Sequence, residues 1–151
     1  MRRKTNPNSQ ISLDDFQKNM TRSFIVSLAA NSLLDEVKNS YEKITNNTFL
    51  VNSLRQLKWI TDQTTGLEEY MLDVFDIHPD HPYRLKIRSL FGEIYQHIEK
   101  AQSALVYVNL NEITDTDDEV EKSRLEIYLY NLNNTLTSLY TTLKNTKFQN
   151  N

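Results

Sequence analysis

Residues 125–143 read LEIYLYNLNNTLTSLYTTL, and leucine recurs in this stretch at alternating intervals of four and three residues. The leucines concerned are Leu125, Leu129, Leu132, Leu136, Leu139 and Leu143. An α-helix has about 3.6 residues per turn, so this spacing places all six on one face, as the a and d positions of a heptad repeat. Such an apolar stripe must be buried. We therefore predict a helix of roughly 28 Å that packs along this leucine seam.

A second apolar seam with the same spacing lies upstream of the first. Its members are Ile87, Phe91, Ile94, Ile98, Ala101, Leu105 and Val108. Two helices of this kind can bury their seams against each other, so we predict a helical hairpin over residues 83–144. The positions that flank the leucine seam are mostly uncharged, whereas a free-standing dimeric coiled coil would carry Glu and Lys there. This difference favours packing inside a larger bundle.

The N-terminal half of the chain predicts another hairpin, over residues 12–77. Ser12 is a good N-cap, and Asp14 and Asp15 complement the exposed amides and the dipole of the helix that follows. We expect that helix to end by residues 45–47 and its buried stripe to change face midway. The stripe comprises Leu13, Phe16, Met20, Phe24 and Leu28, then Ala30, Leu33, Val37, Tyr41 and Ile44. The segment 24–30, FIVSLAA, is apolar nearly all round, which implies either cover on two sides or a kink near Asn31.

The second helix of this half also carries its apolar residues on one face. They are Leu50, Leu54, Leu57, Thr61 and Thr64, continuing to Leu67, Met71 and Phe75. Gly66 interrupts the pattern, and Thr65 followed by Glu68 resembles a capping box, so both one long helix and a restart at Gly66 fit the sequence. Trp59 lies off the stripe, and it marks either a second packing face or an exposed anchor for a partner.

Residues 76–82, DIHPDHP, hold two of the three prolines and separate the two hairpins. Pro82 suits the first turn of the next helix, with His81 or Asp80 as its cap. The predicted fold is therefore an all-α bundle of four long helices, or five if Gly66 breaks the second. It consists of a hairpin over 12–77, a Pro-containing elbow over 78–82 and a hairpin over 83–144, which together form a single domain. We expect residues 1–11 to be a flexible basic arm and residues 145–151 a polar tail.

Composition restricts the class of protein. The absence of cysteine excludes disulfides, thiolate metal sites and cysteine nucleophiles. The net charge of −3 offers no general attraction to nucleic acid or to an anionic membrane. No apolar run is long enough to span a bilayer, and residues 5–23 are too polar for a secretory signal, so we expect a cytoplasmic protein with no membrane partner. Abundant Asn, Lys, Ile, Tyr and Thr are typical of AT-rich genomes, including those of some bacteriophages.

Two clusters of polar residues are candidate sites of chemistry. His78, Asp80 and His81 in the elbow are the residue types that bind zinc or iron, but their spacing fits a polar, helix-capping turn better. Glu68 and Glu69 belong to an acidic stretch that resembles the magnesium-binding pairs of some all-helical hydrolases, without a second pair to face them. The two glycines of the chain stand far apart, which excludes nucleotide-binding loops. We expect no catalytic residue, no metal, no cofactor and no small-molecule substrate.

Several residues instead indicate interaction surfaces. Val106, Tyr107, Ile127 and Tyr130 are apolar but lie off the two seams, so they need cover from the first hairpin or from another chain. We add Trp59 to this set, together with the cationic residues of the N-terminal arm. Those residues are Arg2, Arg3 and Lys4.

These observations predict a non-enzymatic structural or adaptor subunit that docks through helical surfaces and terminal arms into a larger multi-protein assembly, as a homo-oligomer or with other proteins. A bacteriophage particle is the setting that the composition suggests, in which case the protein would reside in the virion. One alternative is a small regulatory or inhibitor protein that binds a host protein or nucleic acid, using the arm and the basic residues Arg84, Lys86 and Arg88. The other is a metal-dependent hydrolase that uses the elbow or Glu68 and Glu69.

Overall fold

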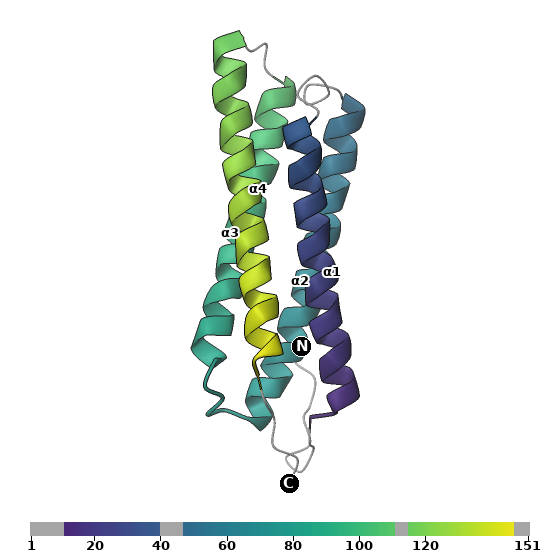
Figure 1. Cartoon of the computed structure of the whole chain (residues 1–151), viewed down its shortest axis with the longest axis vertical. Coiled ribbons are helices and arrows are strands. Elements are labelled where there is room, and N and C mark those ends of the chain that lie inside the picture. The colour runs from purple at the N-terminus through teal and green to yellow at the C-terminus, as the bar shows by residue number, and fades with distance from the viewer. Residues whose placement is uncertain (1–10, 40–46, 111–114, 147–151) are drawn as a thin grey trace.

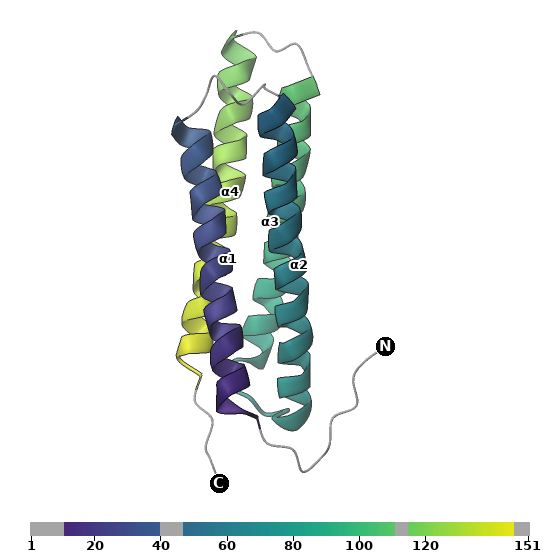
Figure 2. The same ribbon diagram turned by 90° about the vertical axis from the view of Figure 1, so that its right-hand side faces the viewer.

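The computed structural model describes residues 11–39, 47–110 and 115–146, and these form four long helices. They are α1 (Leu13–Asn39), α2 (Asn47–Ile77), α3 (Arg84–Leu110) and α4 (Asp115–Lys144). Each helix runs antiparallel to the one before it, and α4 returns to pack against α1, which closes the bundle (Figures 1 and 2). The predicted all-α bundle of four helices is confirmed, and α4 packs most extensively on α1 and α3.

The two apolar seams predicted for the C-terminal half form the centre of the core. Every residue of the leucine seam of α4 and of the upstream seam of α3 is at most 3% exposed. Gly92, which falls outside the α3 seam, is exposed and has no atom within 4 Å of the position that a Cβ would take. Buried residues from all four helices belong to one hydrophobic cluster.

Helix α1 starts where the sequence predicted, but it buries a different face. Ser12 caps the helix, since its Oγ accepts a hydrogen bond from the amide of Asp15 at 3.2 Å. The predicted buried stripe is wrong at Leu13, Phe24 and Leu28, which are exposed, although Phe16 is buried. The helix is continuous through Asn31. FIVSLAA is not covered on two sides, because Phe24, Ile25 and Leu28 are exposed.

Two serines take the core positions of α1 that the predicted stripe had assigned elsewhere. Ser23 and Ser27 are buried. Their hydroxyls donate to the carbonyls of Met20 and Phe24, each at 2.7 Å, so burial leaves neither hydroxyl unsatisfied. Beyond Ser27 the predicted core residues Ala30, Leu33 and Val37 are buried as expected, whereas Tyr41 and Ile44 lie outside the described residues.

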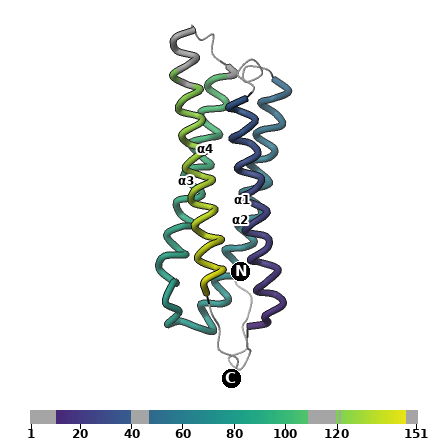
Figure 3. The backbone as a smooth tube through the Cα atoms, viewed as in Figure 1, coloured from purple at the N-terminus to yellow at the C-terminus, as the bar shows by residue number. Residues whose placement is uncertain are grey.

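Helix α2 runs without a break through Gly66, which settles the choice between one long helix and two (Figure 3). Glycine at this position leaves room for a neighbour, because an added Cβ would lie 3.0 Å from Nη1 of Arg22 in α1. A second tie between these helices is the side-chain amide of Gln56, which donates to the carbonyl of Ala29 at 3.0 Å. Trp59 is 42% exposed, so it does not form a buried second packing face.

The elbow between α2 and α3 is organised around His81. Its Nδ1 accepts a hydrogen bond from the amide of Tyr83 at 3.1 Å, and its carbonyl accepts one from the amide of Arg84 at 3.1 Å. The ring of His81 is buried and packs edge-on against Phe75, with ring centroids 5.6 Å apart. His81 therefore serves as the cap, while Pro82 lies in the turn that precedes α3 and not in its first helical turn.

Candidate functional site

Helices α1 and α4 each contain a long stretch without any charged residue. In α1 the stretch runs over residues 23–34, between Arg22 and Asp35, and in α4 it runs over residues 127–143, between Glu126 and Lys144. The two helices lie side by side (Figure 1), and the rings of Phe24 and Tyr140 meet with centroids 5.1 Å apart. The outer surfaces of these two stretches therefore adjoin, and we call them together the charge-free face.

The charge-free face exposes large apolar side chains among small polar ones. On α1, Phe24 is 42% exposed and Leu28 is 51% exposed, with Ile25 beside them. On α4, Ile127 is 55% exposed and Tyr130 is 56% exposed. The other exposed residues of both stretches are Asn31, Ser32, Asn134, Thr137 and Thr141. An exposed apolar surface of this kind commonly marks a site of interaction.

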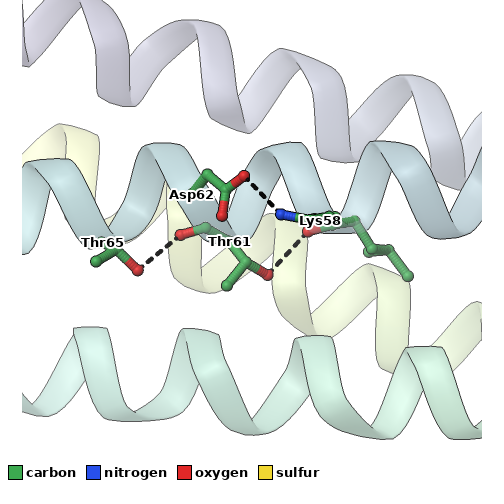
Figure 4. A network of polar contacts seen from close by, with 5 residues as sticks. Lys58, Thr61, Asp62 and Thr65 are labelled. Carbon is green, nitrogen blue, oxygen red and sulfur yellow. Dashed lines mark hydrogen bonds and ion pairs between the residues drawn. The ribbon is translucent and has the colours of Figure 1, made fainter.

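The outer surface of α2 shows what a solvated helix of this protein looks like. There Lys58 Nζ lies 3.2 Å from Asp62 Oδ2 one turn away, and both side chains are well exposed (Figure 4). On the same helix the hydroxyl of Thr61 donates to the carbonyl of Leu57 at 2.9 Å, and that of Thr65 donates to the carbonyl of Thr61 at 3.0 Å. Charges paired at this spacing are ordinary on exposed helices, and the charge-free face has none of them.

The residues that the sequence singled out for interaction are exposed but do not gather in one place. Ile127 and Tyr130, three residues apart, share the outer face of α4. Tyr107 instead lines a groove between α3 and α4. Val106 shares a side of α3 with Tyr95, which lies three turns earlier and donates a hydrogen bond to Glu68 of α2 at 3.0 Å. The first hairpin thus leaves all four exposed.

The remaining interaction candidates fall elsewhere. Arg2, Arg3 and Lys4 lie outside the described residues. Trp59 belongs to the side of α2 that faces α1, since Gln56, one turn before it, bonds to Ala29. Phe24, Ile25 and Leu28 were not predicted to be exposed, because the sequence pattern placed them in the core or on a second covered side. The sequence feature that identifies them is the long uncharged stretch in which they lie, because α4 contains a second stretch of the same kind.

Two grooves flank α4 on its α3 side. One, of about 490 Å³, is lined by side chains of both charges, including Glu99 and Lys100 of α3 and Arg124 of α4. The other, of about 410 Å³, lies between the start of α3 and the last turns of α4, and its lining is mainly Thr, Ser and Asn. Lys86 lines this second groove. Arg84 and Arg88 are each two residues from Lys86, a rotation of about 200° around the helix axis, so they project from the opposite side of α3. The three basic residues therefore do not form one patch.

His81 of the elbow and Glu68 of the acidic pair both make contacts within the bundle. Within the described parts of the chain, no group of three or more His, Cys, Asp or Glu side chains is placed to hold a metal ion. Burial lowers the pKa of His81, and the nearby His78 lowers it further. Glu68 accepts a hydrogen bond from Tyr95, and burial, assisted by Glu68, raises the pKa of that tyrosine to about 12.

No protein-family model, curated protein or solved structure matches this chain. Among the described helices, none is both long and apolar enough to cross a membrane.

Proposed function

We propose that this protein is a non-enzymatic structural or adaptor subunit that docks into a larger multi-protein assembly through the charge-free face. The observation that supports the proposal is the pairing of two uncharged stretches, 23–34 and 127–143, on adjacent helices with large apolar side chains turned outward. Depletion of charge and enrichment of aromatic residues are the features that distinguish the centre of a protein interface from ordinary surface. The AT-rich composition supports a bacteriophage particle as the setting.

In-cell photo-crosslinking tests the docking role. A photo-reactive phenylalanine analogue replaces either Leu28 or Tyr130 on the charge-free face, and Leu85 of α3 serves as the matched control because it is 74% exposed outside this face. We expect discrete protein adducts from positions 28 and 130 and none from position 85. The same adducts should disappear when Ile127→Glu is added. Equal labelling at all three positions, or none at the first two, would contradict the proposal.

A further inference from the structure

We propose that the charge-free face pairs with the same face of a second copy of this chain, in a twofold dimer whose helices run antiparallel across the interface. The inference rests on the proposed docking role of this face and names the occupant. In a twofold interface each surface meets its own copy, so any charge near the axis confronts itself. A face without charges avoids that repulsion. A partner that brought an unmatched charge would instead have to bury it.

The size of the face suits such a pairing. At 1.5 Å per residue, residues 127–143 of α4 span about 25 Å and residues 23–34 of α1 span about 18 Å, and two adjacent helices are roughly 20 Å wide. Protruding side chains add to this projected area. The solvent-accessible area of the face is therefore of the order of the ~800 Å² that each partner contributes to a standard interface.

The charges at the two ends of the face determine the orientation. Phe24 is level with Tyr140, so in these antiparallel helices Arg22 and Lys144 lie near one end of the face. Asp35, Glu36 and Glu126 lie near the other end. One end is therefore bounded by cations and the other by anions, and an antiparallel pairing brings unlike ends together.

The register of four of these charges points to a single axis. Residue 29 is midway between Arg22 and Glu36, and residue 135 is midway between Glu126 and Lys144. Moving five residues along each helix from the contact of Phe24 with Tyr140 shows that residues 29 and 135 are themselves level. A twofold axis that crosses the face there places Glu126 opposite Lys144 of the second copy and Glu36 opposite Arg22 of the second copy.

The pair on α4 has the better geometry. Glu126 and Lys144 are eighteen residues apart, which is five helical turns, so they project from the same side of α4. Arg22 and Glu36 are separated by about 40° around α1, and Arg22 extends toward Gly66 of α2. We therefore assign the α4 pair to the interface itself and the α1 pair to its edge.

Solution mass as a function of protein concentration, measured by light scattering after size exclusion and by sedimentation, tests the pairing. The wild type should form a dimer. Leu28→Asp should weaken it more than a hundredfold, because the change buries an unpaired charge near the axis. Leu85→Asp is the control outside the face and should leave the dimer intact. Circular dichroism on each variant shows that the helices remain folded.

Charge reversal tests the orientation. Glu126→Lys and Lys144→Glu should each weaken the homodimer by about tenfold, since two pairs per dimer become repulsive. A mixture of the two variants should recover a heterodimer of near wild-type affinity. The double swap in one chain should also recover dimerisation. Failure of both single changes to weaken the dimer would overturn the antiparallel arrangement.

The two proposals fail in different ways. A wild type that stays monomeric at every concentration, or a dimer that tolerates Leu28→Asp, overturns self-pairing through this face. If crosslinks at positions 28 and 130 then lead to a different protein, the docking role survives without self-pairing. If those positions give no adduct either, both proposals are overturned.

Discussion

At the scale of single residues, the hydroxyls of two half-buried tyrosines differ in their hydrogen-bonding partners. Tyr95 donates to Glu68 at 3.0 Å, whereas the hydroxyl of Tyr70 has no hydrogen-bonding partner among the described residues. Burial and the charge of Asp15 raise the pKa of Tyr70 to about 12. We expect Tyr95→Phe to cost about 1 kcal/mol in the free energy of unfolding and Tyr70→Phe to be neutral or stabilising. Urea denaturation measures both, and equal losses would refute the distinction.

The elbow histidine gives the stability a dependence on pH. Burial, with His78 as the second cause, lowers the pKa of His81 from its ordinary 6.5. The unfolded chain therefore binds the proton more tightly than the folded one, and stability is lost as the pH falls below about 6.5. Burial lowers the pKa of His97 as well, against the opposing effect of Glu93 and with the assistance of Lys100, so it acts in the same direction.

The histidine prediction is tested with His81→Asn, which keeps a side-chain acceptor for the amide of Tyr83 but cannot titrate in this range. The wild type should lose more stability than the variant between pH 7.5 and pH 5.5, by no more than about 1.4 kcal/mol per pH unit for one site. Urea unfolding at the two pH values measures the difference. Parallel losses in both proteins would show that the elbow makes no contribution.

At the scale of the element, the leucine seam of α4 determines whether the bundle forms. Leu132 is fully buried at its centre, while Asn134, two residues on, is exposed. Leu132→Ala should cost about 2–5 kcal/mol, because it removes buried apolar surface and leaves a cavity. Asn134→Ala should change the stability by less than about 0.5 kcal/mol. Thermal and urea unfolding of the two variants provide the comparison, and similar tolerance of both would be incompatible with the seam.

The fold was predictable where hydrophobic spacing alone decides which face is buried. The seams of α3 and α4 are of this kind, and every position in them is buried as expected. In α1 the same spacing predicted that Phe24 and Leu28 face the core, because both side chains are apolar. Ser23 and Ser27 face it instead, since bonds to carbonyls in the preceding turn satisfy their hydroxyls. Hydropathy does not distinguish a serine satisfied in this way from one that needs water.

At the scale of the whole molecule, the candidate site depends on which helices become neighbours. Ile127 and Tyr130 were recognisable in the sequence as surplus apolar surface. They lie on one surface with Phe24 and Leu28 because α4 returns onto α1, which brings the first and last helices together. No periodicity within a single helix encodes that neighbour. The charge gaps at 23–34 and 127–143 were visible, but only the bundle shows that they form one surface.

The packing of α4 on α1 also predicts how the molecule unfolds. The hairpins 12–77 and 83–144 are consecutive in the sequence, yet residues of all four helices share one core and α4 contacts α1 extensively. Neither hairpin can open without exposing the apolar surface of the other, so unfolding should be a single cooperative transition. Far-UV circular dichroism reports on all the helices, whereas fluorescence of Trp59 reports on α2 alone.

We expect the two signals to give coincident urea transitions at a fixed protein concentration. A substitution in α4 sharpens the test, because it is remote in sequence from the fluorophore. Leu139→Ala should move the Trp59 transition and the circular dichroism transition by the same amount, even though residue 139 belongs to the other hairpin. An earlier or unshifted Trp59 transition would mean that the hairpins unfold separately. The contact between α1 and α4 would then contribute little to cooperativity, however much surface it buries.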